Sequence, residues 1–113
     1  MPYIDVKISK KITDEQKELL KSDLGKAITL IQKPETFLMI GICDGYDLYF
    51  AGKKLASGAY VSVSALGTID ATDSVYMTKR ICKILEERFA IDPSNVYVTY
   101  TDVANWGWNS DNF

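Results

Sequence analysis

Residues 59–66 read Ala-Tyr-Val-Ser-Val-Ser-Ala-Leu, with small or apolar side chains at every second position. An apolar period of two is typical of a β-strand that buries one face. The buried side chains would be Ala59, Val61, Val63 and Ala65. The same alternation over residues 3–8, Tyr-Ile-Asp-Val-Lys-Ile, predicts a second strand of this kind near the start of the chain.

Each of these strands is followed by a segment with helical periodicity. Thr13 and Gln16 form a capping-box pattern, and apolar residues then recur at helical spacing until Lys33-Pro34 ends the helix. The second helix begins among the capping residues at 70–73 and ends at Asp92-Pro93. Its apolar face would consist of Met77, Ile81, Ile84, Leu85 and Phe89.

An extended segment is predicted after each helix. Residues 37–43, Phe-Leu-Met-Ile-Gly-Ile-Cys, form a continuous apolar run that is too short for a helix and indicates a buried strand. Residues 96–100, Val-Tyr-Val-Thr-Tyr, resume as a strand after the second helix. Aligning Pro34 with Pro93 superposes the two halves, so the chain is predicted to contain two β-α-β repeats.

We therefore predict an α+β fold in a single domain that spans residues 1–113. Two pseudo-symmetric β-α-β repeats, about 2–50 and about 58–102, would form a four-stranded mixed sheet with two helices on one face. Residues 103–113 would form a C-terminal aromatic tail. Because the strands carry apolar residues on both faces, we expect the uncovered face to contact partner subunits in a closed oligomer.

The composition excludes several classes of function. Thirteen basic against 15 acidic residues give a net charge of −2, which argues against a nucleic-acid partner or a polybasic membrane surface. No apolar stretch is long enough to insert into a membrane, and the N-terminus does not resemble a signal peptide, so we expect a cytoplasmic protein.

The chain contains no histidine, which excludes catalytic triads, His-ligated zinc and imidazole acid–base chemistry. The two cysteines, Cys43 and Cys82, are far apart in the sequence and are expected to be reduced and buried. With no ligand cluster in the sequence, we expect neither a metal nor a cofactor. Any proton transfer must then use a group other than histidine.

Pro2 and Lys33 each have two interpretations. Pro2 can be a proline tolerated at the start of a strand, or, after removal of Met1, a secondary amine that acts as a general base. Burial beside a cation would lower the pKa of that amine toward neutrality. Lys33 can interact with the last carbonyls of its helix, or it can be that cation.

The C-terminal tail holds both tryptophans of the chain and ends in an aromatic residue. Trp106, Trp108 and Phe113 can dock against the core or a neighbouring subunit. They can equally form the wall of a small pocket for an aromatic substrate.

Taken in order along the chain, five motifs resemble the macrophage migration inhibitory factor family of the tautomerase superfamily. They are Met1-Pro2, Gln32-Lys33-Pro34, Ser64-Ala65-Leu66-Gly67, Asp92-Pro93-x-x-Val96-Tyr97, and the segment from Asn105-Trp106-Gly107-Trp108-Asn109 to Phe113. The resemblance covers essentially the whole chain. It implies a homotrimer with active sites between subunits, which would cover the open face of the sheet.

The resemblance also implies roles for individual residues. Pro2 would be the catalytic base and Lys33 its electrostatic partner, which binds the carboxylate or carbonyl oxygen of an α-keto acid. The backbone N–H of Leu66, where the family usually has Ile, would donate to the substrate. The remaining substrate-binding residues would be Tyr97 from the adjacent subunit, Thr99, Trp106, Trp108, Phe113, Phe37 and Tyr3.

Three departures from the vertebrate members of the family are visible. Thr99 stands in place of an Asn, which removes an amide donor, and Phe37 stands in place of a Tyr, which makes the mouth of the site less polar. Residues 56–60, Ala-Ser-Gly-Ala-Tyr, occupy the position of a C-x-x-C motif. Without those two thiolates, thiol oxidoreductase activity is not expected.

The function implied by the resemblance is keto–enol tautomerisation of phenylpyruvate-like aromatic α-keto acids, with D-dopachrome as a second assay substrate. No cofactor is required. The alternative is a cytokine-like trimer that binds a protein receptor and retains only a vestigial pocket. The family resemblance also implies that secretion without a signal peptide is open to such a protein.

Overall fold

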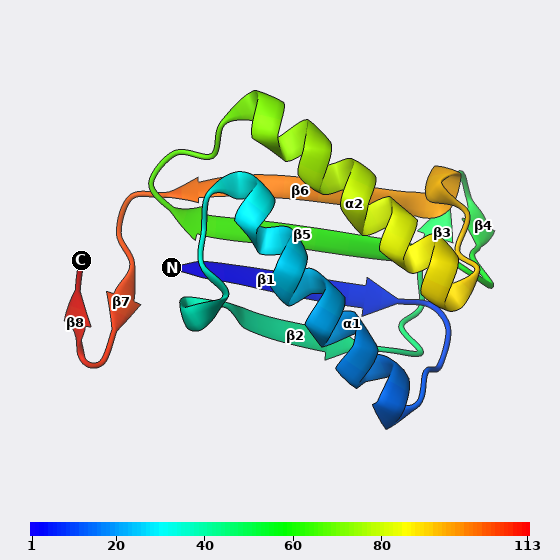
Figure 1. Ribbon diagram of the computed structural model, residues 1–113. Coiled ribbons are helices and arrows are strands. Elements are labelled where there is room, and N and C mark those ends of the chain that lie inside the picture. The colour runs from blue at the N-terminus through cyan, green and yellow to red at the C-terminus, as the bar shows by residue number, and fades with distance from the viewer.

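Four strands form one mixed sheet in the order β2-β1-β5-β6 (Figure 1). The computed structural model describes residues 1–113. The sheet strands are β1 (Pro2–Ile8), β2 (Met39–Cys43), β5 (Ala59–Leu66) and β6 (Val96–Val103). Two short hairpins complete the strands: β3 (Tyr49–Phe50) with β4 (Lys53–Lys54), and β7 (Gly107–Trp108) with β8 (Asp111–Asn112).

The pairing of the strands confirms the predicted repeat. β1 is parallel to β2 and β5 is parallel to β6, whereas β1 and β5 are antiparallel. Parallel strands need a crossover connection, and one long helix lies in the connection between the strands of each parallel pair. These helices are α1 (Asp14–Ala27) and α2 (Ala71–Phe89).

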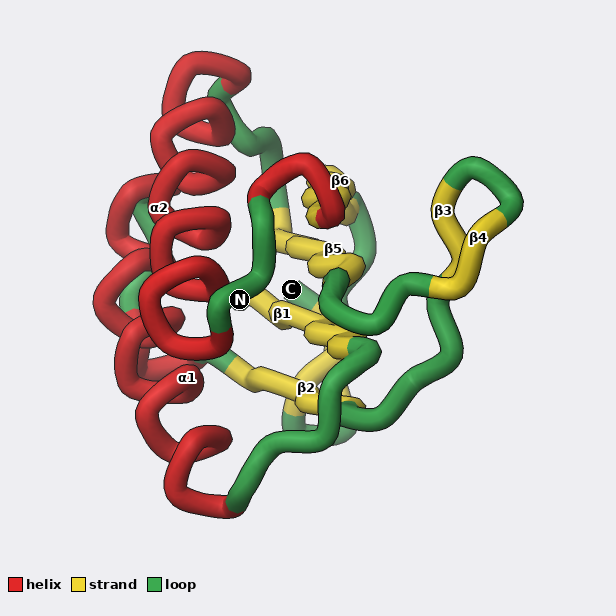
Figure 2. Tube along the Cα trace, turned by 90° about the vertical axis from the view of Figure 1, so that its right-hand side faces the viewer, coloured by secondary structure: helices red, strands yellow, loops and turns green.

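Both helices lie on the same face of the sheet, as predicted (Figure 2). The alternation in β1 and β5 directs their apolar side chains toward the helices, and none of these side chains is more than 3% exposed. The predicted apolar face of α2 is likewise buried against the sheet. At the start of α1, Thr13 and Gln16 form both hydrogen bonds of the predicted capping box.

Several element boundaries differ from the sequence prediction. The expected strand over residues 37–43 begins only at Met39, because Glu35–Phe37 forms a 3₁₀ turn (η2) whose Glu35 carbonyl accepts from Leu38 N–H at 2.9 Å. The first helix changes to a 3₁₀ turn over Ile28–Ile31 (η1) before the chain reverses at Gln32. β6 continues three residues beyond the predicted end, to Val103.

The open face of the sheet is more polar than the sequence prediction stated. Apart from the aromatic Tyr3, Tyr60 and Tyr97 and the exposed Met39, it presents an Asp5–Lys7 ion pair at 2.6 Å and several hydroxyl side chains. Cys43 lies on this face at the edge strand β2 and is exposed, so the prediction that it is buried was wrong. Cys82 on α2 is half-buried, and burial raises the pKa of its thiol.

The two hairpins extend from opposite ends of the sheet (Figure 1). The β7–β8 hairpin lies beside the N-terminus, whereas the β3–β4 hairpin projects on the side of the sheet away from the helices (Figure 2). No helix of the structure has both the length and the apolar character that a membrane span requires.

Two adjacent leucines on α1 test the position of the core. Leu20 is fully buried and Leu19 is 45% exposed, so Leu20→Ala should lower the free energy of unfolding by about 2–5 kcal/mol. Leu19→Ala, which removes the same atoms from the surface, should change it by less than about 0.5 kcal/mol. Urea denaturation of both variants measures the difference. Equal losses would contradict the assignment of the buried face of α1.

Candidate active site

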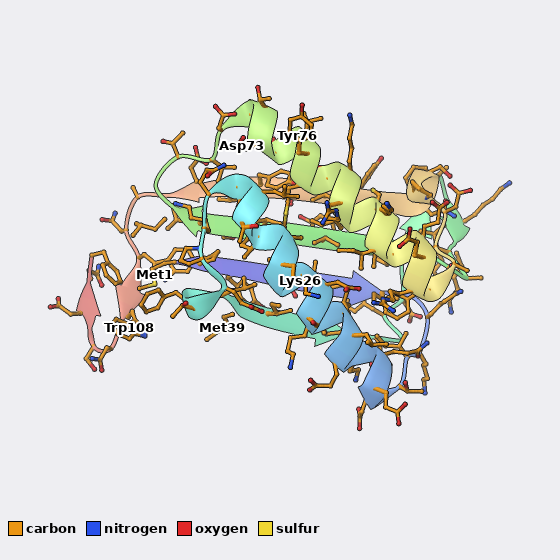
Figure 3. All side chains as sticks on the ribbon, in the orientation of Figure 1. Met1, Lys26, Met39, Asp73, Tyr76 and Trp108 are labelled. Atoms are coloured by element: carbon orange, nitrogen blue, oxygen red, sulfur yellow. The ribbon has the colours of Figure 1, made fainter.

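The N-terminus lies at the centre of one end of the sheet. Pro2 begins β1, which is an interior strand between β2 and β5, and pairs with Ala65 across the ladder. Pro2 is buried and Met1 is half-buried, although both stand at the start of the chain. Met1, Met39 and Trp108 all lie at this end of the molecule (Figure 3). The first two residues are therefore part of the packed structure rather than a free tail.

Both the N–H and the carbonyl of Leu66 form hydrogen bonds. Its N–H donates to the Met1 carbonyl at 3.0 Å, and its carbonyl accepts from Lys33 Nζ at 2.9 Å. These bonds connect the N-terminus, β5 and the segment after η1. The Lys33 ammonium thus reaches the end of the sheet rather than the last carbonyls of its own helix. This is the location that the electrostatic interpretation of Lys33 requires.

The pKa of the Met1 α-amine is lowered from its ordinary value. Burial is the larger cause, because it disfavours the charged ammonium form. The positive charge of Lys33 acts in the same direction. This end of the sheet therefore favours the uncharged form of a terminal amine more than water does, and the uncharged form is the one that can accept a proton.

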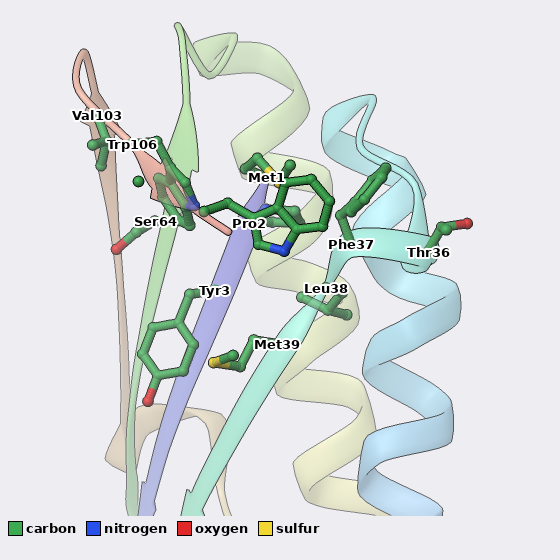
Figure 4. Close-up of a pocket in the computed structure, with 12 residues that line it drawn as sticks. Met1, Pro2, Tyr3, Thr36, Phe37, Leu38, Met39, Ser64, Val103 and Trp106 are labelled. Atoms are coloured by element: carbon green, nitrogen blue, oxygen red, sulfur yellow. The ribbon is translucent and has the colours of Figure 1, made fainter. Parts of the chain in front are cut away.

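A cavity of about 790 Å³ opens beside this amine (Figure 4). Eight of its 12 lining residues are hydrophobic, and the polar side chains include the hydroxyls of Tyr3, Thr36 and Ser64. The lining residues are Met1, Pro2, Tyr3, Thr36, Phe37, Leu38, Met39, Ser64, Val103, Trp106, Gly107 and Trp108. Lys33 and Leu66 do not line the cavity; Met1, which bonds to Leu66, does.

The aromatic tail folds back to form one wall of this end of the molecule. Trp108 packs edge-to-face on Phe37, with ring centroids 5.8 Å apart, and stacks on Phe113 at 6.2 Å. The Phe113 N–H donates to the Trp106 carbonyl at 3.0 Å, which closes the β7–β8 hairpin. Phe113 contributes to a smaller hollow beside the main cavity. The tail thus brings three predicted residues, Trp106, Trp108 and Phe113, to the site.

Tyr97 and Thr99 lie elsewhere in the subunit. Tyr97 pairs with Tyr60, which in turn pairs with Lys7, so it is about 16 Å along the sheet from Pro2. It is 63% exposed on the open face and contacts Phe50 of β3 at a centroid distance of 5.4 Å. One subunit alone therefore does not bring these two residues to the cavity.

Sequence reasoning missed some residues of the site. Ser64 and Met39 line the cavity beside Tyr3, with which both are paired in the sheet. The period of two in residues 59–66 puts Ser64 on the face opposite the core, but only the register aligns it with Tyr3. Tyr60 does not line the cavity, but its hydroxyl lies 2.8 Å from Oγ1 of the predicted residue Thr99. The structure contains no group of three His, Cys, Asp or Glu side chains that could hold a metal ion.

Comparison with known proteins identifies the family. The sequence profile of macrophage migration inhibitory factor (MIF) matches residues 1–113, the whole chain. The chain belongs to the MIF family. Its fold is that of the tautomerase superfamily.

Individual MIF proteins are related to the chain at moderate identity. Macrophage migration inhibitory factor of Rattus norvegicus is 29% identical over 83 residues, which cover 72% of this chain and 71% of the rat protein. The crystal structure of Leishmania major MIF2 is 28% identical and superposes with a TM-score of 0.93, covering 100% of this chain and 97% of that one. The MIF-like protein of Entamoeba histolytica, 23% identical with 99% and 98% covered, has the same fold at a TM-score of 0.89.

Replacing Lys33 tests the electrostatics of the N-terminus. Lys33→Met keeps most of the side-chain length and removes the charge, so the pKa of the N-terminal amine should rise while remaining below its ordinary value, because burial persists. An NMR pH titration of the N-terminal residue measures this pKa, and mass spectrometry identifies which residue carries the amine. Lys53→Met on the distant β4 strand is the matched control. A pKa that moves equally in both variants, or in neither, would contradict the role of Lys33.

Proposed function

We propose that this chain is a keto–enol tautomerase of phenylpyruvate-like aromatic α-keto acids, with the Pro2 amine as general base. The observation that supports the proposal is the packed N-terminus next to an apolar cavity, where burial and the Lys33 charge lower the pKa of the Met1 amine, one residue before Pro2. A base with a pKa near the working pH is the most effective general base. The chain has no histidine to fill this role.

Removal of Met1 is the step that creates the proposed base. In the full chain the Pro2 nitrogen is part of a peptide bond, whose lone pair is delocalised and which is not basic. Once Met1 is removed, Pro2 carries a secondary amine at the same end of the sheet. The Leu66 N–H loses the Met1 carbonyl at the same time and becomes free to donate to a substrate oxygen.

The Lys33 ammonium has donors left for a substrate. It carries three N–H groups, and one donates to the Leu66 carbonyl. The others can bind the carboxylate of an α-keto acid. The side chains of Phe37, Trp106 and Trp108 would hold the aromatic ring, since an apolar cavity with few polar groups fits such a substrate.

The reaction then follows from these positions. The Pro2 amine removes a proton from the carbon next to the keto group, and the electron pair of that C–H bond moves to form the C=C bond of an enolate. Lys33 and the Leu66 N–H stabilise the negative charge that develops on oxygen. Return of the proton from Pro2 to that oxygen gives the enol and regenerates the free amine. No cofactor takes part.

The proposed assembly is a homotrimer with active sites between subunits. The sheet of one subunit leaves a whole face and the edges of β2 and β6 without partners, and exposed strand edges are usually covered in folded proteins. A neighbouring subunit could bring its Tyr97 and Thr99 to the Pro2 cavity. One protein of the same fold, 20% identical, has been solved as a symmetric trimer of fused 4-OT. Another, Pt0534, 18% identical, is inactivated by 2-oxo-3-pentynoate, itself a 2-oxo acid.

Activity of the Pro2→Gly variant tests the base. Untagged, Met1-processed protein should tautomerise phenylpyruvate, and Pro2→Gly should lose about 10²–10⁴-fold in kcat, the usual contribution of a general base. Spectrophotometry follows the enol, and mass spectrometry confirms that Met1 is absent. Light scattering should give three times the 12.7 kDa subunit mass. An inactive but processed and trimeric protein would reject the tautomerase and favour the alternative, a protein-binding trimer.

The Tyr60–Thr99 hydroxyl pair offers a substitute for the amide that vertebrate members have at position 99. Of its two O–H groups, one is used between the partners at 2.8 Å, which leaves the other to donate to a substrate in the neighbouring subunit's cavity. Tyr60→Phe combined with Thr99→Val removes both O–H groups and should raise KM about 2–10-fold with a smaller effect on kcat. Tyr49→Phe, on the β3 strand, is the control because that side chain is exposed. An unchanged KM in the double variant would remove the pair from the site.

A further inference from the structure

A second concave surface lies on the other side of the molecule, between the two long helices. Two adjoining hollows of about 220 and 230 Å³ share Arg80 and Lys83 of α2. Lys26 of α1 lines the first, and Leu30 and Tyr76 line the second. Figure 3 shows Lys26 and Tyr76 on the helical layer, away from the open face of the sheet. We call these two hollows together the interhelical groove.

The interhelical groove is strongly basic in a chain that is acidic overall. Five cations line it against two carboxylates, whereas the whole chain has a net charge of −2. The cations are Lys26, Lys79, Arg80, Lys83 and Arg88, and the carboxylates are Asp23 and Glu87. The groove therefore has an excess of three positive charges, five less two, in a chain with a net charge of −2.

The carboxylates are concentrated at one end of the interhelical groove. Asp23 is held by Arg88, with Nε to Oδ2 at 2.8 Å, and Glu87 lies 3.9 Å from Lys83. Lys26, Lys79 and Arg80 have no carboxylate oxygen within 4.0 Å. Cations gathered without counter-charges repel one another, and a bound anion would relieve that repulsion.

We propose that the interhelical groove binds the diphosphate group of a small phosphorylated compound. The planar guanidinium of Arg80 matches phosphate oxygens with two parallel hydrogen bonds, and lysines add point charges. Lys79 and Lys83 are four residues apart on one helix, so they project from the same face with their Cβ atoms about 5–6 Å apart. Lys26 faces them from α1, which allows the side chains to converge on two neighbouring phosphates from both sides.

The rest of the interhelical groove fits a ligand that carries an organic part. Leu30 and Ile84 give the groove an apolar floor. Tyr76 also lines the groove and is 57% exposed. The Lys79 ammonium already lies 5.7 Å from the centre of that ring. The apolar floor and the phosphate-binding cations are therefore contiguous.

Titration with pyrophosphate at constant ionic strength tests the site. In ¹H–¹⁵N NMR spectra, shifts should be confined to Asp23, Lys26, Leu30 and residues 76–88. Arg80→Gln should weaken binding about tenfold, as expected for loss of hydrogen bonds to a charged group. Lys53→Gln is the matched control: Lys53 is exposed on β4 and also has no carboxylate within 4.0 Å. ADP and vesicles that contain phosphatidylinositol phosphates then distinguish a soluble ligand from a lipid headgroup.

The outcomes separate this proposal from the tautomerase. Arg80→Gln should leave phenylpyruvate tautomerisation unchanged, because the groove and the cavity at Pro2 share no residue. Equal weakening in Arg80→Gln and Lys53→Gln, or shifts spread over lysines outside the groove, would show general charge screening and overturn the site. Absence of pyrophosphate binding would overturn it as well.

Discussion

The structure depends on the placement of β1 inside the sheet, hydrogen-bonded to β2 on one side and β5 on the other. Because this interior strand is also the first segment of the chain, the N-terminal residues are packed between neighbours instead of being free in solution. Their burial lowers the pKa of the terminal amine and brings Met1 within hydrogen-bond distance of Leu66. The cavity and its proposed chemistry follow from this one topological fact.

Much of the fold could be predicted from periodicity. The alternation in residues 3–8 and 59–66 gave the correct buried faces, because one face of each strand packs on helices with clear apolar stripes. The start of β2 could not be predicted in this way. The apolar side chain of Phe37 favours a strand, but its backbone belongs to the 3₁₀ turn that begins at Glu35. The exposure of Cys43 was missed for a related reason: a continuous apolar run does not reveal that one of its faces has no partner within the subunit.

The candidate site was predictable only in part. Pro2 and Lys33 each had two interpretations, and only the resemblance to the family favoured the catalytic one. Their connection through the Leu66 backbone depends on the register of β1 against β5, which no local pattern encodes. Tyr97 and Thr99 came from family resemblance alone, and the structure places them far from Pro2 in the same subunit. The Tyr60–Thr99 contact likewise joins two strands that are distant in sequence.

The early position of β1 also has a consequence for biosynthesis. β1 is synthesised about 60 residues before its partner β5, which at about 5–20 residues per second corresponds to about 3–12 s. Until then the strand cannot complete its ladder, because its contacts are long-range in sequence. The proposed function requires removal of Met1, and during this interval Met1 is not yet packed beside Leu66. The order of synthesis therefore gives an aminopeptidase time to act on an N-terminus that is still unfolded.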